Sequence, residues 1–108
     1  MSVEAIPYCI YGYCVNADDF KYMIDLTDYD SLEDWIDDYN RYEWCFLDDW
    51  NDEVYIGVEV GYDNLAMELP SKLILFMDNI QEYVNFTRLP KEVKEEGARF
   101  HVFNIWSI

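Results

Sequence analysis

The sequence predicts a single α+β domain in which a small antiparallel sheet packs against two or three helices. The chain has 108 residues, near the usual size of one domain. Although it is strongly charged, 52% of its residues are hydrophobic and 19% are aromatic, so it has enough apolar area to build a core. Segments with strand-like alternation are separated by short connections from segments with helical periodicity, and no repeat or linker divides residues 1–108.

The first part of the chain predicts a β-hairpin. Residues 8–15 are rich in aromatic and β-branched residues, which favours a strand, and Gly12 within them indicates a bulge. Residues 16–19 have the composition of a turn. Every second residue over 20–26 is apolar, which predicts a second, half-buried strand paired with the first.

An acidic helix is predicted to follow. Ser31 precedes Asp34 by three residues, which approximates a capping box at the start of a helix. The apolar residues that come next recur with helical spacing and form one stripe: Leu32, Trp35, Ile36 and Tyr39. The acids between them must therefore point outward: Glu33, Asp34, Asp37 and Asp38. These acids form like-charge pairs four residues apart, each of which costs about 0.2–0.5 kcal/mol.

The middle of the chain predicts two more strands. Residues 44–47 form a short apolar run, and residues 54–60 alternate in the manner of a strand. Between them, residues 48–53 predict an acidic loop. The pattern of residues 64–69 is compatible with more than one structure.

The last third predicts two helices and a strand. Ser71 is placed to cap a helix over 72–86, with six residues toward the core: Leu73, Phe76, Met77, Ile80, Tyr83 and Val84. Pro90 and Gly97 bracket a short helix. Residues 99–106 predict the final strand.

Negative charge is concentrated in one half of the chain. Residues 1–53 hold 15 acids against two bases, Lys21 and Arg41, for a net charge of −13, whereas residues 54–108 hold 8 acids against 5 bases, for −3; together these give the total of −16. A chain selected only for solubility would mix lysines among its acids. We therefore expect an anionic face formed mainly by residues 18–53.

No motif for catalysis or for a cofactor is present. His101 is the only histidine and lies in an apolar strand, where a packing or edge position is expected. The sequence lacks the His/Cys spacing of a zinc site and a glycine-rich phosphate loop. The run from Asp25 to Asp30 departs from the EF-hand pattern for calcium. We expect a protein that is not an enzyme and that needs no cofactor or metal.

The cysteines and the hydropathy suggest a cytoplasmic protein. Cys9, Cys14 and Cys45 are an odd number without a CxxC motif, which fits a reducing compartment and buried thiols. On one strand, Cys9 and Cys14 would face opposite sides. No basic, apolar start typical of a signal peptide is present, and no apolar run approaches the roughly 18 residues of a membrane span.

We expect the anionic face to bind a protein that normally binds nucleic acid. Duplex DNA carries one negative charge per roughly 1.7 Å of its axis, and helical carboxylates four residues apart lie about 6 Å apart along the helix. Lysines and arginines arranged for phosphates can engage such carboxylates. The predicted contact residues are Asp25, Asp28, Asp30, Glu33, Asp34, Asp37, Asp38, Asp48, Asp49, Asp52 and Glu53. The plain alternative is that these acids form only a solvated face of a soluble protein.

Aromatic residues within the acidic segment have two interpretations. Tyr29 and Tyr42 are candidates for stacking on arginine side chains of a partner. Trp50 lies in the acidic loop, where it is either an anchor of the contact or a lid on the core.

Residues 10–50 resemble the start of the ArdA-type antirestriction proteins. Three segments carry the resemblance: Ile10-Tyr11-Gly12-Tyr13, then Tyr22-Met23-Ile24-Asp25-Leu26-Thr27-Asp28-Tyr29-Asp30-Ser31-Leu32-Glu33-Asp34-Trp35, and Phe46-Leu47-Asp48-Asp49-Trp50. That family consists of DNA mimics from mobile elements that occupy the DNA groove of type I restriction–modification enzymes. The resemblance implies an inhibitor that acts in the host cytoplasm. ArdA proteins are longer and more acidic in their later part, so a CRISPR nuclease is an alternative target.

A second class of function has similar requirements. A small acidic immunity protein that neutralises a basic nuclease toxin also needs Asp, Tyr and Trp on one rigid face. A mimic should inhibit several DNA-binding enzymes, whereas an immunity protein binds one cognate toxin. In either case we expect a basic DNA- or RNA-binding protein as the partner, and no direct contact with nucleic acid or membrane. The apolar residues of the second half are expected to offer a homodimer interface.

Overall fold

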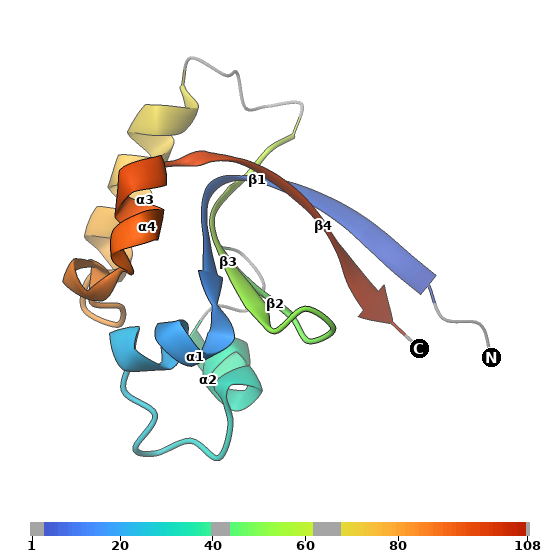
Figure 1. Cartoon of the computed structure of the whole chain (residues 1–108), viewed down its shortest axis with the longest axis vertical. Coiled ribbons are helices and arrows are strands. Elements are labelled where there is room, and N and C mark those ends of the chain that lie inside the picture. Colours follow the sequence, from blue (N-terminus) through green and yellow to red (C-terminus); the bar gives the residue numbers. More distant parts are fainter. Residues whose placement is uncertain (1–3, 40–43, 62–67, 108) are drawn as a thin grey trace.

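Four antiparallel strands form one sheet in the order β2-β3-β1-β4 (Figure 1). The computed structural model describes residues 4–39, 44–61 and 68–107. Its strands are β1 (Glu4–Asn16), β2 (Cys45–Asp48), β3 (Glu53–Glu59) and β4 (Arg99–Ser107). Its α-helices are α1 (Ala17–Phe20), α2 (Leu32–Tyr39), α3 (Leu69–Ile80) and α4 (Lys91–Glu96). The predicted α+β class with an antiparallel sheet is confirmed.

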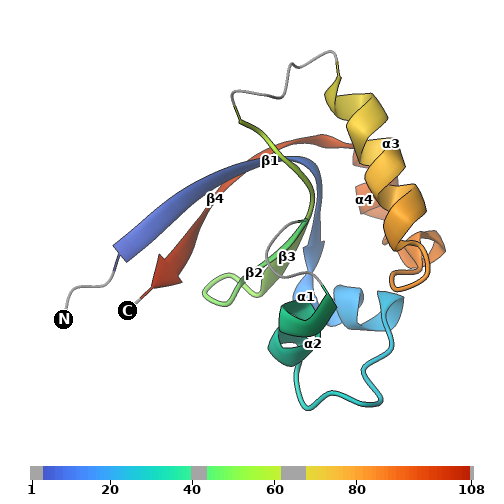
Figure 2. The ribbon, with the colours of Figure 1, turned by 180° about the vertical axis from the view of Figure 1, so that it is seen from behind.

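The central strand β1 changes partners along its length. From Glu4 to Gly12 it pairs with β4, and from Ile10 to Asn16 it pairs with β3. The outer part of β1 therefore forms a two-stranded ribbon with β4, which extends beyond the helices in both views (Figures 1 and 2).

Two glycines face each other where β1 changes partners. Gly12 lies directly opposite Gly57 of β3. A Cβ atom on Gly12 would lie 2.0 Å from the carbonyl oxygen of Ile56, and one on Gly57 would lie 2.3 Å from that of Tyr11. The register continues unbroken through this pair, so the predicted bulge at Gly12 is wrong. The glycines are needed because the two backbones approach too closely for any side chain.

The predicted strand over residues 20–26 is also wrong, and so is the hairpin it would form. Phe20 ends α1, the next residues form a 3-10 helix, η1 (Lys21–Met23), and residues 24–26 form neither helix nor strand. The Asn16 side chain caps α1 by accepting a hydrogen bond from the Asp18 N–H at 2.9 Å. Phe20 and Met23 lie three residues apart and are both buried, so the core selects the helical spacing over the alternation.

The acidic helix α2 forms as predicted. The Ser31 hydroxyl accepts a hydrogen bond from the Asp34 N–H at 3.2 Å and caps its first turn. Leu32, Trp35 and Ile36 are buried. Tyr39, the last residue of the predicted stripe, is partly exposed but lies against the Trp35 ring, with ring centroids 5.0 Å apart.

The predicted strands around the acidic loop and at the end of the chain are confirmed as β2, β3 and β4. Helix α3 begins before the predicted residue 72, because Pro70 fits its first turn, where no backbone donor is required. The helix ends at Ile80, so Tyr83 and Val84 lie beyond it; Val84 is buried and Tyr83 is exposed. Helix α4 is capped at its C-terminal end by Gly97, which has a positive φ of 72°. Most of the segment 64–69, left open above, lies outside the described residues.

The helices and the core lie mainly on one face of the sheet. The main cluster joins Val15, Val54 and Ile56 of the sheet to apolar residues of α1, η1 and α2. A smaller cluster lies on the opposite face, where Phe103 of β4 stacks on Tyr55 of β3 at 3.9 Å. Cys14 packs against that smaller cluster, and Cys9 lies on the other face of β1, as expected; the three cysteines are free thiols. None of the described helices has the length and apolarity required to cross a membrane.

Candidate functional site

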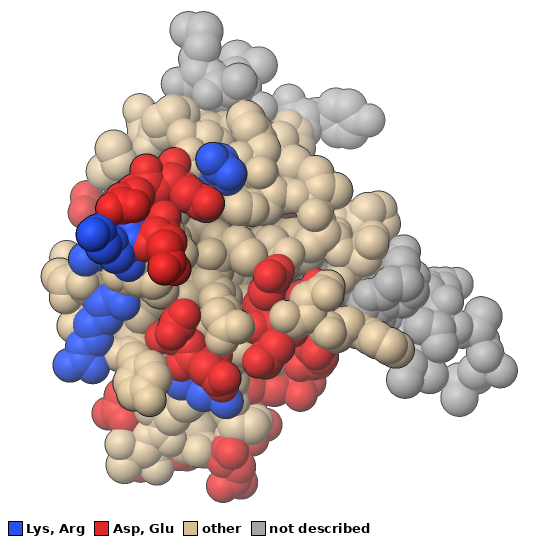
Figure 3. Space-filling view, in the orientation of Figure 1, with Lys and Arg blue, Asp and Glu red and all other residues tan. Residues whose placement is uncertain are grey.

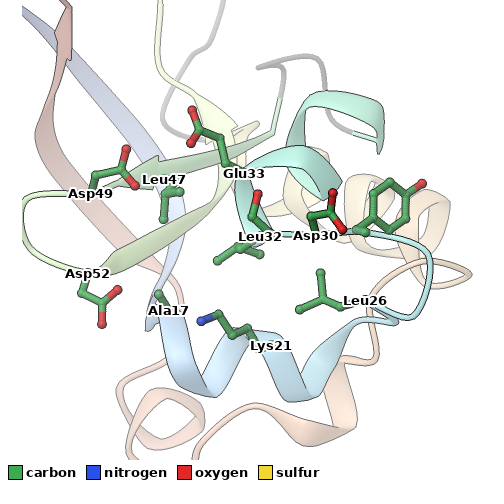
Figure 4. A pocket seen from close by; sticks show the side chains of 11 residues that line it. Ala17, Lys21, Leu26, Asp30, Leu32, Glu33, Leu47, Asp49 and Asp52 are labelled. Carbon is green, nitrogen blue, oxygen red and sulfur yellow. The ribbon is translucent and has the colours of Figure 1, made fainter.

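Acidic side chains from two segments that are distant in the sequence, residues 30–33 and 49–52, meet around one pocket (Figure 4). The pocket has a volume of about 420 Å³ and lies between α1, the start of α2 and the turn from β2 to β3. Four predicted contact residues line it: Asp30, Glu33, Asp49 and Asp52. We call these four residues the rim acids. Apolar side chains complete the lining: Ala17, Leu26, Leu32 and Leu47.

Helix α2 presents its acids away from the core. Glu33, Asp34, Asp37 and Asp38 are all exposed. They alternate with the buried Leu32, Trp35 and Ile36 at helical spacing, so they occupy the opposite side of α2. The prediction of an outward acidic stripe is confirmed for this helix.

Hydrogen bonds to acids of the loop and of α2 hold the loop before α2 in place. Asp25, Asp28 and Asp30 are exposed. The Asp25 carboxylate accepts hydrogen bonds from the hydroxyl and the N–H of Thr27, which lower the pKa of Asp25. The Tyr29 hydroxyl donates a hydrogen bond to Asp38 and thus joins the loop to α2. That hydrogen bond is the main reason why the pKa of Tyr29 is raised.

Asp48 does not belong to the contact surface, so its prediction is wrong. Its side chain is only 4% exposed. One carboxylate oxygen accepts hydrogen bonds from the backbone N–H groups of Trp50 at 3.1 Å and Asn51 at 3.3 Å, and the other accepts from the Asn51 side chain at 2.7 Å. Asp48 therefore holds the β2–β3 turn that presents Asp49 and Asp52.

Glu53 is also engaged inside the protein. It is half-buried, and one of its carboxylate oxygens accepts hydrogen bonds from the Tyr55 hydroxyl at 2.9 Å and the Cys14 thiol at 3.5 Å. Burial, together with the charge of Glu53, raises the pKa of Cys14 to about 12. The register places these residues on the sheet face opposite the main core, so a contact role for Glu53 is not supported.

Two aromatic side chains stand out from the acidic part of the surface. Trp50, at the tip of the β2–β3 turn, is 76% exposed, so it is not a lid on the core. Tyr22, which follows α1, is 72% exposed. The sequence did not indicate that Tyr22 is exposed, because the alternation over residues 20–26 predicted a half-buried strand with Tyr22 among its apolar residues. Tyr29 is half-buried in the pocket wall, and Tyr42 lies outside the described residues.

Lys21 was not predicted as part of the site. Its side chain extends into the pocket among the rim acids (Figure 4), and its ammonium group lies 3.6 Å from the carboxylate of Asp18 on α1. Its place in the sequence, three residues after Asp18, is the only signal that could have indicated this ion pair.

The ion pairs between described residues do not include the rim acids. They join Lys21 to Asp18, Lys72 to Glu68, Lys91 to Glu95 and Arg99 to Glu96. Figure 3 shows bases beside acids at α4, whereas acids predominate over bases in the lower part of the view, where α1 and α2 lie. Arg41, the one base within residues 25–53, lies outside the described residues.

The described residues offer little for metal chemistry. No group of three or more His, Cys, Asp or Glu among residues 4–39, 44–61 and 68–107 could hold a metal ion. His101 is half-buried on the edge strand β4, with its ring 5.8 Å from that of Tyr55. Burial lowers the pKa of His101, so its neutral form is favoured.

A comparison with protein-family models, with curated proteins and with solved structures found no match for this chain.

Proposed function

We propose that this protein is an acidic DNA mimic that inhibits a nucleic-acid-binding defence enzyme by occupying its DNA site. The observation that carries the proposal is the meeting of Asp30, Glu33, Asp49 and Asp52 around one pocket, beside the outward acids of α2. The ion pairs between described residues do not use these four acids. A basic protein surface would therefore meet a field that is negative on balance at this end of the molecule, where Lys21 is a base within the pocket.

The arrangement suits a cleft that normally holds phosphates. Carboxylates accept bidentate hydrogen bonds from arginine, as phosphates do. The hydrogen bond between Tyr29 and Asp38 and the bonds of Asp48 within its turn fix the backbone that presents the acids. A preorganised surface loses less conformational entropy on binding. The resemblance of residues 10–50 to ArdA-type proteins supports the same proposal, and it favours a restriction–modification enzyme as the target.

Inhibition of DNA cleavage tests this proposal. We expect the protein to inhibit a type I restriction enzyme or a CRISPR nuclease competitively with duplex DNA, and to lose potency as salt rises. The informative variant neutralises the rim acids with near-isosteric side chains: Asp30→Asn, Glu33→Gln, Asp49→Asn and Asp52→Asn. Asparagine tolerates the positive φ of 55° at position 52. We expect this variant to inhibit at least about tenfold less well.

A matched control separates the position of the charges from their number. It combines Asp78→Asn with Glu92→Gln, Glu95→Gln and Glu96→Gln, four exposed acids of the second half. Both variants remove four negative charges and take the net charge from −16 to −12. The control should inhibit like the parent protein. Equal loss in both variants, or full inhibition by the rim variant, would contradict a localised mimic.

The exposed aromatics favour immunity as a second candidate function. Trp50 and Tyr22 are of the residue types that dominate tight, specific interfaces. For an immunity protein, Trp50→Ala would abolish binding to one basic nuclease toxin and the protein would leave other DNA-binding enzymes untouched. For a DNA mimic, the same variant would still inhibit several enzymes, because the charges act collectively. A panel of purified nucleases of both kinds separates the two functions.

A further inference from the structure

Among the described residues, no strand is hydrogen-bonded to the outer edge of β4, although β2 approaches β4 without pairing with it. Within residues 4–39, 44–61 and 68–107, β4 pairs with β1 alone. The strand is nine residues long, and its register with β1 runs without a bulge from Ser107 to Arg99. It contains no proline and none of the acids or lysines that commonly protect an edge strand.

The pairing of β1 identifies which backbone groups face this open edge. The Cys9 carbonyl, on the β3 side of β1, accepts a hydrogen bond from the Val60 N–H at 2.8 Å. Cys9 and Val102 are opposite each other, so this pair exchanges no hydrogen bonds between β1 and β4. The N–H and C=O groups of Val102 therefore point outward, and alternation gives the same direction to Phe100 and Asn104.

The same residues have exposed side chains. Val102 is 77% exposed and Phe100 is 52% exposed. Asn104 is exposed as well. Outward-facing backbone groups and exposed apolar side chains thus occur together along one edge. This combination is typical of a sheet edge that binds an additional strand.

The distribution of charge indicates what can approach this edge. The chain has 23 acids, but residues 5–15 and 97–108, which contain most of the ribbon formed by β1 and β4, have none. A second copy with a net charge of −16 is repelled by the acidic end of the first. It meets the least repulsion at this ribbon, where residues 5–12 and 99–107 include Arg99 and no acid.

We propose that β4 pairs with β4 of a second copy and joins the two four-stranded sheets into one. An antiparallel pair of identical strands closes around a two-fold axis. With that axis at Val102, Val102 pairs with its own counterpart, and Phe100 lies opposite Asn104 of the partner subunit. All three outward residues are then used. Because α1 follows the other end of β1 from the ribbon, and α2 lies beside α1 (Figures 1 and 2), both acidic ends stay uncovered.

The oligomeric state of the full chain tests this proposal. Analytical ultracentrifugation should show a shift from 13.0 kDa to twice that mass as the concentration rises to about 100 μM, where a complex with a micromolar Kd is nearly saturated. Added NaCl should strengthen the dimer, because it screens the repulsion between the two chains. Binding of a DNA mimic to its target weakens with salt, so the two proposals fail separately.

Two variants and hydrogen exchange locate the interface. Val102→Lys places a charge on the open edge and should leave a folded monomer, whereas Val102→Thr should still dimerise. Ile74→Lys, on the exposed side of α3, is the matched control and should dimerise like the parent protein. In the dimer, the amide protons of Phe100, Val102 and Asn104 should exchange more slowly as the concentration rises.

Several outcomes would overturn the proposal. A mass of one chain at every concentration and salt would exclude the second copy. A dimer that persists in Val102→Lys would place the interface elsewhere. Growth beyond two chains would exclude the closed two-fold pair. A monomer whose Val102→Lys variant loses inhibition would assign the edge to the target enzyme instead.

Discussion

At the scale of single residues, Asp48 shows how a charged side chain can serve the site without belonging to its surface. It lies in the most acidic part of the sequence, next to Asp49, yet it is buried and Asp49 is exposed. Its carboxylate accepts three hydrogen bonds from Trp50 and Asn51. No sequence pattern separates these two neighbours. The difference comes from the fold: Asp48 is the last residue of β2, whereas Asp49 lies in the turn that follows.

We expect Asp48→Ala to destabilise the protein by about 1–3 kcal/mol, because it removes the charged acceptor of three hydrogen bonds in the turn. Asp49→Ala is the matched control and should change the free energy of unfolding by less than about 0.5 kcal/mol. Urea denaturation monitored by fluorescence measures both. Equal effects of the two variants would show that the bonds of Asp48 do not stabilise the turn.

At the scale of elements, the glycine pair fixes the shape of the sheet. Gly57→Ala would place a Cβ 2.3 Å from the backbone oxygen of Tyr11. Backbone cannot yield as a side chain does, so we expect a loss at or beyond the upper end of the about 1–3 kcal/mol typical of overpacking. Gly61→Ala is the control: no atom lies within 4 Å of its Cβ, and it should be neutral or stabilise by up to about 1 kcal/mol.

The measurement for this pair of variants is chemical denaturation of each protein beside the parent. A Gly57→Ala variant as stable as Gly61→Ala would mean that β1 and β3 can separate at no cost. Loss of stability in both variants would instead indicate a general need for glycine in this part of the chain.

Elements with a single pattern were predictable from the sequence, whereas elements whose pattern fits two structures, or that depend on close packing, were not. The strands around the acidic loop, the final strand and α2 have a single pattern that favours one structure. Residues 20–26 fit both alternation and helical spacing, and the burial of Phe20 and Met23 decided between them. The place of β4 beside β1 depends on contacts between residues about a hundred positions apart, such as Glu4 and Ser107, which no local pattern contains.

For the candidate site, the sequence predicted the composition of the acidic end better than its geometry. The outward acids of α2 followed from one apolar stripe. The meeting of Asp30 with Asp49 and Asp52 required the fold. Glu53 was misplaced because it stands at a strand terminus, where alternation directs it toward Tyr55 and Cys14.

At the scale of the whole molecule, self-repulsion should make stability depend on salt. The net charge is −16, and raising NaCl from about 20 mM to about 500 mM shortens the Debye length from more than 10 Å to less than 8 Å. We expect the Tm to rise by several degrees, since about 1 kcal/mol corresponds to roughly 4–8 °C in a domain of this size. Differential scanning calorimetry at both salt concentrations measures the change.

The two charge variants refine this prediction. Neutralising the rim acids removes repulsion where acids are most crowded, so that variant should lose more of its response to salt than the control with changes at Asp78 and α4. A Tm that is unaffected or lowered by NaCl would show that the folded chain tolerates its charge without strain.

The pairing of β1 with β4 also sets an order for synthesis. Translation proceeds from the N-terminus, so every acid of the predicted contact set has been made by residue 53, whereas β4 begins at Arg99. The outer part of β1 therefore leaves the ribosome before its partner β4 has been made. It cannot form this pairing until residues 99–107 have been synthesised. Such distant pairing slows folding, and a nascent chain of this protein has its anionic segment long before it has a finished sheet.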